Sequence, residues 1–101
     1  MWLQVSFDLP VKSEIDRKKA ADFRTNLLKI GFEMAQFSLY LRYCRNMEIR
    51  NKYVNKIKEF SPKNGKIHIL TFTDTQYENI ISIHASELPE LKKKPQRLTT
   101  Y

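Results

Sequence analysis

Residues 2–10, WLQVSFDLP, alternate between apolar and polar side chains with the two-residue period of a β-strand. The apolar face carries Leu3, Val5 and Phe7, and the polar face carries Gln4, Ser6 and Asp8. Pro10 lacks an N–H group and biases the residue before it towards an extended backbone, so we expect the strand to stop there. The pattern therefore predicts a first strand that ends on an acidic residue beside a loop.

A helix is predicted to follow, beginning near Glu14. Ser13 followed by Asp16 resembles a capping box in which Asp replaces the usual Glu. Apolar side chains then recur at helical spacing and form the stripe that we expect to be buried, namely Ala20, Phe23, Leu27 and Ile30. Gly31 supplies the left-handed backbone that commonly ends a helix.

Residues 32–44 are predicted to form one long second strand, because apolar and polar side chains alternate again. The face expected to be buried carries Ala35, Phe37, Leu39, Leu41 and Tyr43, and the opposite face carries Gln36, Ser38, Tyr40 and Arg42. Asn46 is a suitable N-cap for a second helix. That helix would bury the stripe Ile49, Tyr53, Ile57 and Phe60. Its other faces are rich in lysine and arginine, which usually means a solvated surface.

Two more strands are predicted after the turn sequence SPKNG at residues 61–65. Residues 66–73 carry apolar side chains on both faces, which is typical of a central strand. Residues 74–76 are expected to form a turn or a single helical turn, and residues 78–84 a fourth strand. His68 and His84 are conceivable metal ligands, but isolated histidines on strands are more often structural, and no second ligand stands at a convincing spacing.

The order of these elements is the split βαβ pattern of an α+β, ferredoxin-like βαββαβ-type sandwich over residues 1–84. Both helices would cover one face of an antiparallel sheet. The other face is expected to carry Asp8, Gln36, Ser38, Tyr40 and Arg42 and to be buried by dimerisation, although a solvated face is also allowed. Residues 85–101 form a charged tail that is either free or docks on a partner subunit, where residues 98–101 would add a strand.

The charge balance points to an anionic partner. The chain has 18 Lys and Arg against 11 Asp and Glu, a formal net charge of +7, and nucleic acid is the first candidate. No apolar run approaches the ~20 residues of a membrane span, and no signal peptide is evident. The single cysteine, Cys44, excludes an internal disulfide or a zinc cluster and suits a reducing cytoplasm.

Asp8 is the first candidate for chemistry, because an acid at the end of a strand is well placed to hold a metal ion or a water molecule. The simpler interpretation is that Asp8 only makes a local hydrogen bond to the turn backbone. The strand alone does not decide between these two interpretations.

Three stretches resemble one known family: FDLP at residues 7–10, FRTNLLKIGFEMAQFSLYLR at residues 23–42 and NGKIHILTFTDTQYENI at residues 64–80. Their most specific elements are the strand-end Asp8, the pair Gln36-x-Ser38 and the turn Thr73-Asp74-x-Gln76. In order and spacing these elements are similar to the CRISPR-associated endoribonuclease Cas-two family, the small subunit of the CRISPR spacer-adaptation complex. The resemblance extends to about residue 84 and leaves the tail unmatched.

The resemblance implies a homodimer of ferredoxin-like subunits, in which the C-terminal segment often adds a strand to the other subunit. It implies a metal-dependent phosphodiesterase acting on RNA or double-stranded DNA. It also implies a bridge between two dimers of a larger integrase subunit during spacer acquisition. Asp8 matches the family's metal-binding acid, and two copies of Asp8, one per subunit, could share Mg²⁺ or Mn²⁺.

Two functions therefore compete: a metal-dependent endonuclease with Asp8 as its catalytic acid, and a scaffold that holds duplex DNA while a partner performs the chemistry. Catalysis usually needs further acids and a base, so the sequence favours the scaffold. A third possibility is a non-catalytic ferredoxin-like nucleic-acid-binding module, although the central strands lack a pair of RNA-stacking aromatics. The basic residues predicted to contact phosphates are Lys12, Arg17, Lys18, Arg42 and Arg45.

Overall fold

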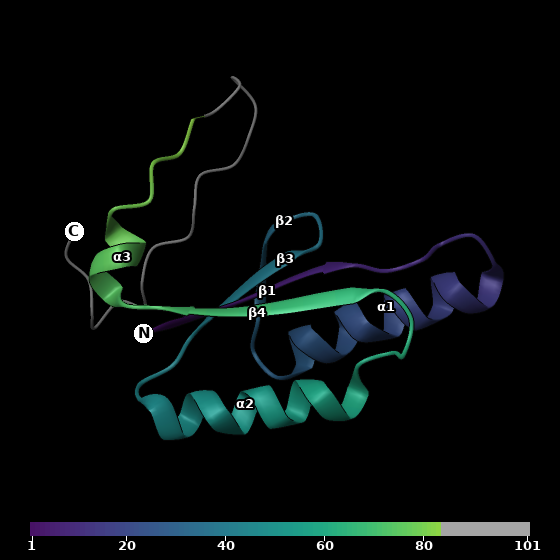
Figure 1. The fold of residues 1–101 in the computed structure, drawn as a ribbon, viewed down its shortest axis with the longest axis horizontal. Coiled ribbons are helices and arrows are strands. Elements are labelled where there is room, and N and C mark those ends of the chain that lie inside the picture. Colours follow the sequence, from purple (N-terminus) through teal and green to yellow (C-terminus); the bar gives the residue numbers. More distant parts are fainter. Residues whose placement is uncertain (84–101) are drawn as a thin grey trace.

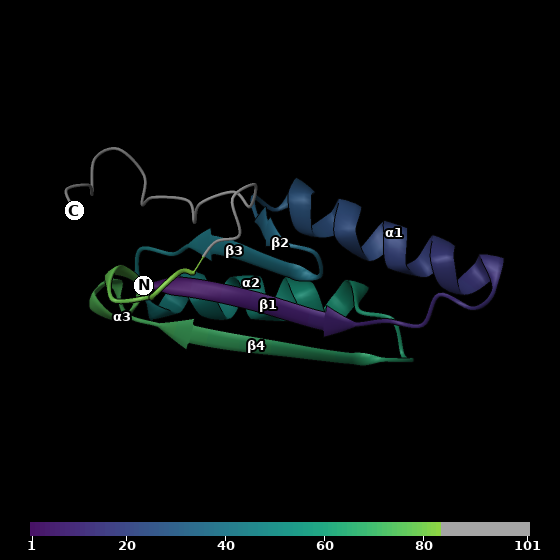
Figure 2. The same cartoon turned by 90° about the horizontal axis from the view of Figure 1, so that it is seen from above.

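A computed structural model of the chain describes residues 1–83, which form a four-stranded antiparallel sheet with three helices. The elements follow in the order β1 (Trp2–Asp8), α1 (Glu14–Lys29), β2 (Glu33–Gln36), β3 (Leu39–Tyr43), α2 (Met47–Phe60), β4 (Lys66–Phe72) and α3 (Asp74–Glu78). The strands lie in the order β2-β3-β1-β4 (Figures 1 and 2). This order confirms the ferredoxin-like fold, with the acid-ended strand β1 in the middle of the sheet.

The helix α1 begins and ends where its capping residues predict. The Ser13 side chain accepts a hydrogen bond of 3.0 Å from the backbone N–H of Asp16. Gly31 follows the helix with a φ of +92°, a conformation that costs glycine little and other residues more. The helix α2 is capped by Asn46, whose side chain accepts from the Ile49 N–H at 2.9 Å.

The main core lies between the sheet and the two long helices. It joins Leu3, Val5, Phe7, Phe23, Leu27 and Ile57, all of which are buried. The ring of Phe7 on β1 meets the ring of Phe23 on α1 edge-to-face, with centroids 5.0 Å apart. We call this helix-covered side of the sheet the covered face. The prediction that both helices lie on one face is confirmed.

The prediction of one long strand over residues 32–44 is wrong, because this segment is a hairpin of β2 and β3. The chain reverses at Phe37 and Ser38, and Ser38 takes a left-handed φ of +61°. The register pairs Val5 with Tyr40 and Leu3 with Arg42, so Tyr40 and Arg42 lie on the covered face. Tyr40 is buried there, whereas Phe37, which was predicted to be buried, is 92% exposed.

The side of the sheet away from α1 and α2, which we call the open face, has a small core of its own. Trp2, Leu41 and Tyr77 are buried in it, and the partly buried Ala35, Leu39, Tyr43 and Phe72 pack against them. The rings of Trp2 and Tyr77 stack with centroids 4.1 Å apart. The prediction that Tyr40 and Arg42 lie on the open face is therefore wrong, because the alternation of β3 runs in the opposite phase and places Leu39, Leu41 and Tyr43 there.

Two expectations for the end of the domain also need correction. β4 pairs only with β1 and so lies at an edge of the described sheet, not in its centre. Its apolar residues serve both cores, since Ile67 and Ile69 pack on the covered face and Phe72 on the open face. Residues 78–83 form no strand, because α3 extends to Glu78 and the backbone after it is irregular.

The helix α3 has a complete capping box. The Thr73 side chain accepts from the Gln76 N–H, and the Gln76 side chain accepts from the Thr73 N–H. Asp74 in its first turn pairs with the amino group of Met1 at 2.9 Å, which ties α3 to the start of β1 (Figure 1). The helical turn predicted at residues 74–76 is confirmed. The predicted positions of His84 and of the tail lie outside the described residues.

Candidate functional site

Asp8 is the last residue of β1, and its side chain is exposed on the open face. Lys66, the first residue of β4, lies directly opposite it in the sheet register. The backbone of Gly65 passes close by, since a Cβ at that position would stand 2.7 Å from the Asp8 carbonyl oxygen. The turn before β4 therefore packs tightly against the strand end and leaves the carboxylate facing solvent.

The loop after Asp8 is held by Arg17. The Nη1 atom of Arg17 donates to the carbonyl oxygens of Val11 at 3.0 Å and Lys12 at 3.3 Å. Arg17 therefore shapes the loop as well as contributing positive charge to it. Lys12 and Lys18 are exposed beside it, and Lys18 pairs with Asp22 at 3.7 Å, a surface contact that holds the lysine only weakly.

Arg42 and Arg45 do not join this group. The guanidinium of Arg42 lies over the Tyr53 ring, 4.2 Å from its centroid, and Nη2 donates to the Tyr53 hydroxyl at 2.5 Å. Arg45 is exposed in the connection to α2, at the opposite end of the sheet from Asp8. The seven residues of β1, at about 3.3 Å each, put these two ends roughly 20 Å apart.

The described residues, 1–83, do not fit a complete metal centre. Among residues 1–83, no three His, Cys, Asp or Glu side chains lie close enough together to hold an ion. Mg²⁺ is commonly bound through one or two carboxylates with the remaining positions taken by water and substrate phosphate. Within residues 1–83, Asp8 could supply one such carboxylate, and no second acid or histidine pair completes a site around it.

The sheet brings two further residues to the same surface, of which sequence reasoning missed Lys66 and regarded His68 as structural. Lys66 is paired with Asp8, and His68, two residues along β4, is paired with Ser6, so both share the open face with the carboxylate. Only knowledge of which strand pairs with β1, and in what register, reveals these neighbours. The two-residue alternation of residues 66–73 predicts neither the strand that pairs with β1 nor the register of that pairing.

The other reactive side chain, Cys44, has no place in this site. Its thiol is buried in the main core after β3. Burial raises the pKa of the Cys44 thiol, and the nearby positive charges of Arg42, the N-terminus and Arg50 oppose this effect only in part. The neutral, enclosed thiol is unsuited to be a nucleophile.

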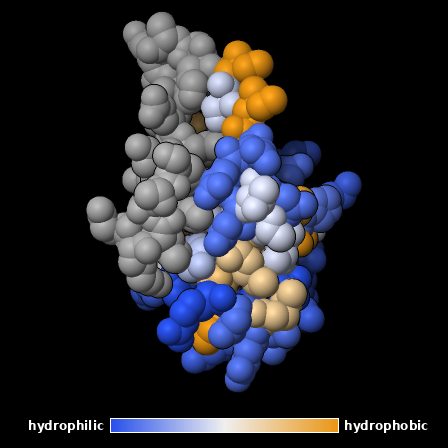
Figure 3. Space-filling view, turned by 90° about the vertical axis from the view of Figure 1, so that its left-hand side faces the viewer, coloured by the Kyte–Doolittle hydropathy of each residue, from blue (hydrophilic) through white to orange (hydrophobic). Residues whose placement is uncertain are grey.

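An exposed apolar segment follows α3. Ile80, Ile81 and Ile83 are all exposed in the irregular segment at residues 79–83. Seen from the α3 end, the surface shows hydrophobic atoms gathered at one extremity, while much of the remaining described surface is hydrophilic (Figure 3). None of the described helices is both long and apolar enough to cross a membrane.

Fold and site together define a small ferredoxin-like domain with one exposed acid at the end of its central strand and basic residues in the loop and helix that follow. The model of the family described as CRISPR associated protein Cas2 matches residues 1–80. The chain therefore belongs to the CRISPR associated protein Cas2 family.

Curated relatives agree with this membership along most of the chain. A protein named CRISPR-associated endoribonuclease Cas2 from Paracidovorax avenae is 41% identical over 101 residues, which cover 100% of this chain and 94% of the relative. A protein of the same name from Flavobacterium psychrophilum is 35% identical over 101 residues, covering 100% of this chain and 88% of the relative. A third, from Ligilactobacillus salivarius, is 33% identical over 97 residues, covering 96% of each chain.

Proposed function

We propose that this chain acts as a homodimeric scaffold in CRISPR spacer acquisition, where it holds duplex DNA between copies of a larger integrase subunit. One observation carries the proposal: within residues 1–83, Asp8 belongs to no group of three potential metal ligands, whereas exposed lysines lie in the loop and helix that follow it and directly across from it on β4. Phosphodiester hydrolysis generally needs a metal centre or an acid and a base held in mutual reach. Gripping a duplex needs only positive charges placed to meet phosphates.

The cations available for this task lie in the loop and first turns of α1. Lys12 and Lys18 are exposed, and Lys66 adds a third positive charge across from Asp8. A two-fold dimer would present each of these residues twice, so one duplex could meet both copies. Because such contacts go to phosphates, binding would be independent of sequence and would weaken steeply with salt.

Arg42 and Arg45 have different parts in this proposal from Lys12 and Lys18. Arg42 is engaged by Tyr53 on the covered face, so it supports α2 rather than the duplex. Arg45 is exposed at the far end of the sheet and would meet only a duplex that runs the length of β1. We therefore assign the principal phosphate contacts to the Asp8 end.

The test combines duplex binding with spacer integration. Replacing Lys12, Arg17 and Lys18 together by Ala should weaken duplex binding and lower the slope of log affinity against log salt, by about one for each lost phosphate contact. The matched control replaces Lys29 and Lys52, which are exposed elsewhere on α1 and α2. A Lys12→Ala, Lys18→Ala double variant separates charge from the loop contacts of Arg17. Unchanged affinity and slope in the triple variant would show that the duplex runs elsewhere.

A second function, metal-dependent cleavage of RNA or double-stranded DNA, is favoured by the exposed Asp8 carboxylate and by the endoribonuclease name of the relatives. Asp8 from each of two subunits would hold the Mg²⁺ or Mn²⁺. When bound, such an ion polarises a phosphodiester and lowers the pKa of a bound water. The contribution of each chain is to place one carboxylate at a strand end, where β4 and its turn pack against the backbone of Asp8.

Asp8→Asn separates the two functions. Cleavage that needs Mg²⁺ or Mn²⁺ should fall by orders of magnitude in this variant, while duplex binding and spacer integration persist. Asp22→Asn, which changes an exposed acid on α1, is the matched control and should keep both activities. Cleavage at full rate in Asp8→Asn would locate the chemistry outside this residue or in a contaminant.

A further inference from the structure

Lys66 lies directly across the sheet from the Asp8 carboxylate. Asp8 ends β1, Lys66 begins β4, and the two residues are partners in the antiparallel register. Side chains at paired positions leave the same face of the sheet, with Cβ atoms about 4.5–5.5 Å apart. Both side chains are exposed. The ammonium group of Lys66 can therefore reach the space in front of the carboxylate, where a metal ion held by Asp8 would have to lie.

The position of Lys66 is fixed by the turn that precedes it. Gly65 has a φ of +95°, and a Cβ there would stand 2.7 Å from the Asp8 carbonyl oxygen. The turn backbone thus packs so closely against the end of β1 that it leaves no room for a side chain at this position. Where the turn leaves α2, the Ser61 hydroxyl donates to the Ile57 carbonyl oxygen at 2.6 Å. The lysine side chain consequently starts from a backbone that is held next to Asp8.

No third group in the described part of the chain neutralises either of these two charges. The ion pairs found within residues 1–83 involve other side chains, and no side-chain hydrogen bond there uses Asp8 or Lys66. Asp8 also belongs to no group of three potential metal ligands in this part of the chain. The register therefore gives Asp8 a lysine as its neighbour, where a metal site would need another acid.

A second copy of the chain would not change this charge balance. In a dimer through the open face, each Asp8 would arrive with its own Lys66, because the register joins the two residues within one chain. The formal charges of two carboxylates and two ammonium groups cancel, so such a site would offer no net negative charge to a divalent cation. A doubly charged ion about 4 Å from an ammonium group binds roughly tenfold more weakly for that reason, even in water with screening salt.

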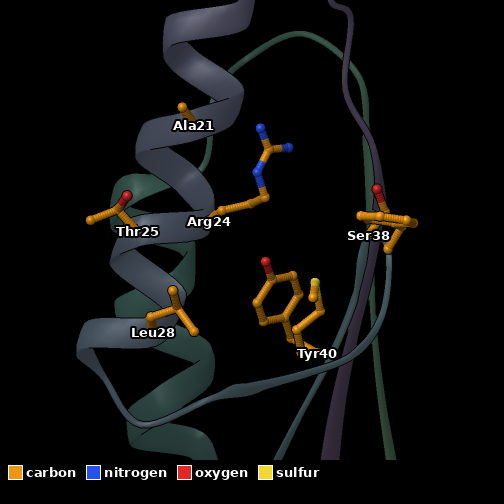
Figure 4. Close-up of a pocket in the computed structure, with 8 residues that line it drawn as sticks. Ala21, Arg24, Thr25, Leu28, Ser38 and Tyr40 are labelled. Carbon is orange, nitrogen blue, oxygen red and sulfur yellow. The ribbon is translucent and has the colours of Figure 1, made fainter. Parts of the chain in front are cut away.

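Two other features of residues 1–83 do not supply the missing ligands. His68 shares the open face, but it lies diagonal to Asp8, opposite Ser6. A groove with a volume of about 580 Å³ between α1 and the β2–β3 hairpin is lined by no acid. Figure 4 shows the Arg24 side chain reaching from α1 into this groove, with the Tyr40 ring facing it from the sheet. The groove therefore disfavours a cation, and Asp8 remains the acid at which metal binding should be tested.

We propose that Lys66 takes the place of a metal ion beside Asp8: its ammonium group counters the carboxylate and keeps divalent cations away. An exposed pair of this kind contributes little to stability, so the effect of Lys66 is on what Asp8 can bind. The flexible stem of lysine also lets the ammonium group move from the carboxylate to a phosphate. The inference rests on the proposed scaffold, since it assigns the positive charge at this end of the sheet to a side chain, and it weighs against metal-dependent cleavage.

The experiment measures the affinity of the full chain for Mn²⁺ alone, by electron paramagnetic resonance of the free ion, with no nucleic acid present. Lys66→Gln removes the charge, Lys66→Glu places a second carboxylate opposite Asp8, and Lys66→Arg keeps the charge. Lys52→Gln, at an exposed position on α2, is the matched control for the loss of one positive charge. Asp8→Asn in the Lys66→Gln background shows whether a site that is gained is built on Asp8. Far-ultraviolet circular dichroism verifies that every variant is folded.

We expect the wild type and Lys66→Arg to bind Mn²⁺ weakly, with a Kd of about 1 mM or above. Lys66→Gln should bind the ion about tenfold more tightly or better, and Lys66→Glu more tightly still, because the repelling charge beside Asp8 is gone. Lys52→Gln should bind as the wild type does. Asp8→Asn should abolish the gain in the Lys66→Gln background.

Three results would each overturn the inference. The first is an unchanged affinity for Mn²⁺ in Lys66→Gln, and the second is a gain that survives Asp8→Asn. The third is tight binding by the wild type that Asp8→Asn removes, which would favour metal-dependent cleavage instead. None of these results changes the duplex affinity of the variant that lacks Lys12, Arg17 and Lys18, so the scaffold fails or stands by its own test.

Discussion

The covered and open faces of the sheet differ in how completely their side chains are buried. On the covered face, Leu3, Val5 and Leu27 are completely buried, and aromatic rings from β1 and α1 meet in the core. On the open face, Trp2 and Leu41 are buried but Leu70 is 46% exposed. The indole Nε1 of Trp2 is enclosed with no hydrogen-bond partner found within residues 1–83.

This difference teaches that the two long helices bury one side of the sheet, while the other keeps an apolar surface that our proposed dimer would cover. Solvent-facing antiparallel sheets usually carry polar side chains, whereas here Leu39, Tyr43 and Phe72 extend the apolar surface around Trp2. A two-fold axis through the open face would bury this surface against its own copy. It would also bring two Asp8 carboxylates to a common interface, which is the arrangement that a shared metal site requires.

The largest expected effect concerns two neighbouring residues of α1, Leu27 and Leu28, which differ sharply in burial. Leu27 is fully buried in the main core, whereas Leu28 is 54% exposed. Leu27→Ala should lower the free energy of unfolding by about 2–5 kcal/mol, because it removes buried methyl groups and leaves a cavity. Leu28→Ala should cost less than about 0.5 kcal/mol. Urea unfolding at one protein concentration measures both, and equal losses would contradict the burial described for α1.

A smaller effect is expected at Gly31, where the covered face ends. The φ of +92° and the position of Arg42, whose Nη1 would stand 2.5 Å from an added Cβ, both oppose a side chain there. Gly31→Ala should therefore cost about 1–3 kcal/mol. In an Arg42→Ala background the steric part should vanish and the backbone part remain. The same cost in both backgrounds would show that Arg42 does not crowd this position.

The smallest effect concerns pH and Cys44. Because burial raises the thiol pKa in the folded state, the folded protein keeps this proton at a pH where the unfolded chain loses it. The stability contributed by the neutral thiol is complete below the unfolded pKa of about 8.5 and declines as pH rises through the folded value. The difference in urea midpoint between the wild type and Cys44→Ala should therefore shrink from pH 7 to pH 10. A constant difference would mean that Cys44 titrates alike in both states.

Much of the fold could be predicted because local chemistry determines it. Ser13 and Asn46 cap their helices through side-chain oxygens, and Gly31 ends α1 with a conformation that favours glycine. The alternation of β1 was sufficient because its two faces differ clearly in polarity. The exposed position of Asp8 at the end of β1 was predictable for the same reason, since it is the last polar residue before a proline.

The hairpin could not be predicted in the same way. Its turn at Phe37 and Ser38 lacks the glycine, proline or asparagine that normally marks such a reversal. The more polar face of β3, with Tyr40 and Arg42, is the one that meets the helices, so alternation alone pointed to the wrong face. Tyr40 serves the main core, while Leu41 serves the smaller core with Trp2, and only the pairing with β1 reveals this.

The strand expected at residues 78–84 was wrong for a related reason. Its alternating isoleucines fit an edge strand, but the capping box of Thr73 and Gln76 starts a helix that carries the chain through Glu78. Ile80, Ile81 and Ile83 are left exposed instead of paired within the described chain. A two-residue period shows that a segment could form a strand, but it does not show that a neighbouring strand is available to pair with it.

Sedimentation of the wild type, Leu70→Asp and Leu28→Asp at tens of micromolar tests most directly whether a second copy covers the open face. Leu70 lies on that face, opposite Gln4, and Leu28 lies on α1 at the groove. We expect the wild type and Leu28→Asp to be dimers with more than ~1,000 Å² buried in total, and Leu70→Asp to be a folded monomer. A monomeric wild type, or a Leu70→Asp variant that dimerises as tightly as the wild type, would contradict the account.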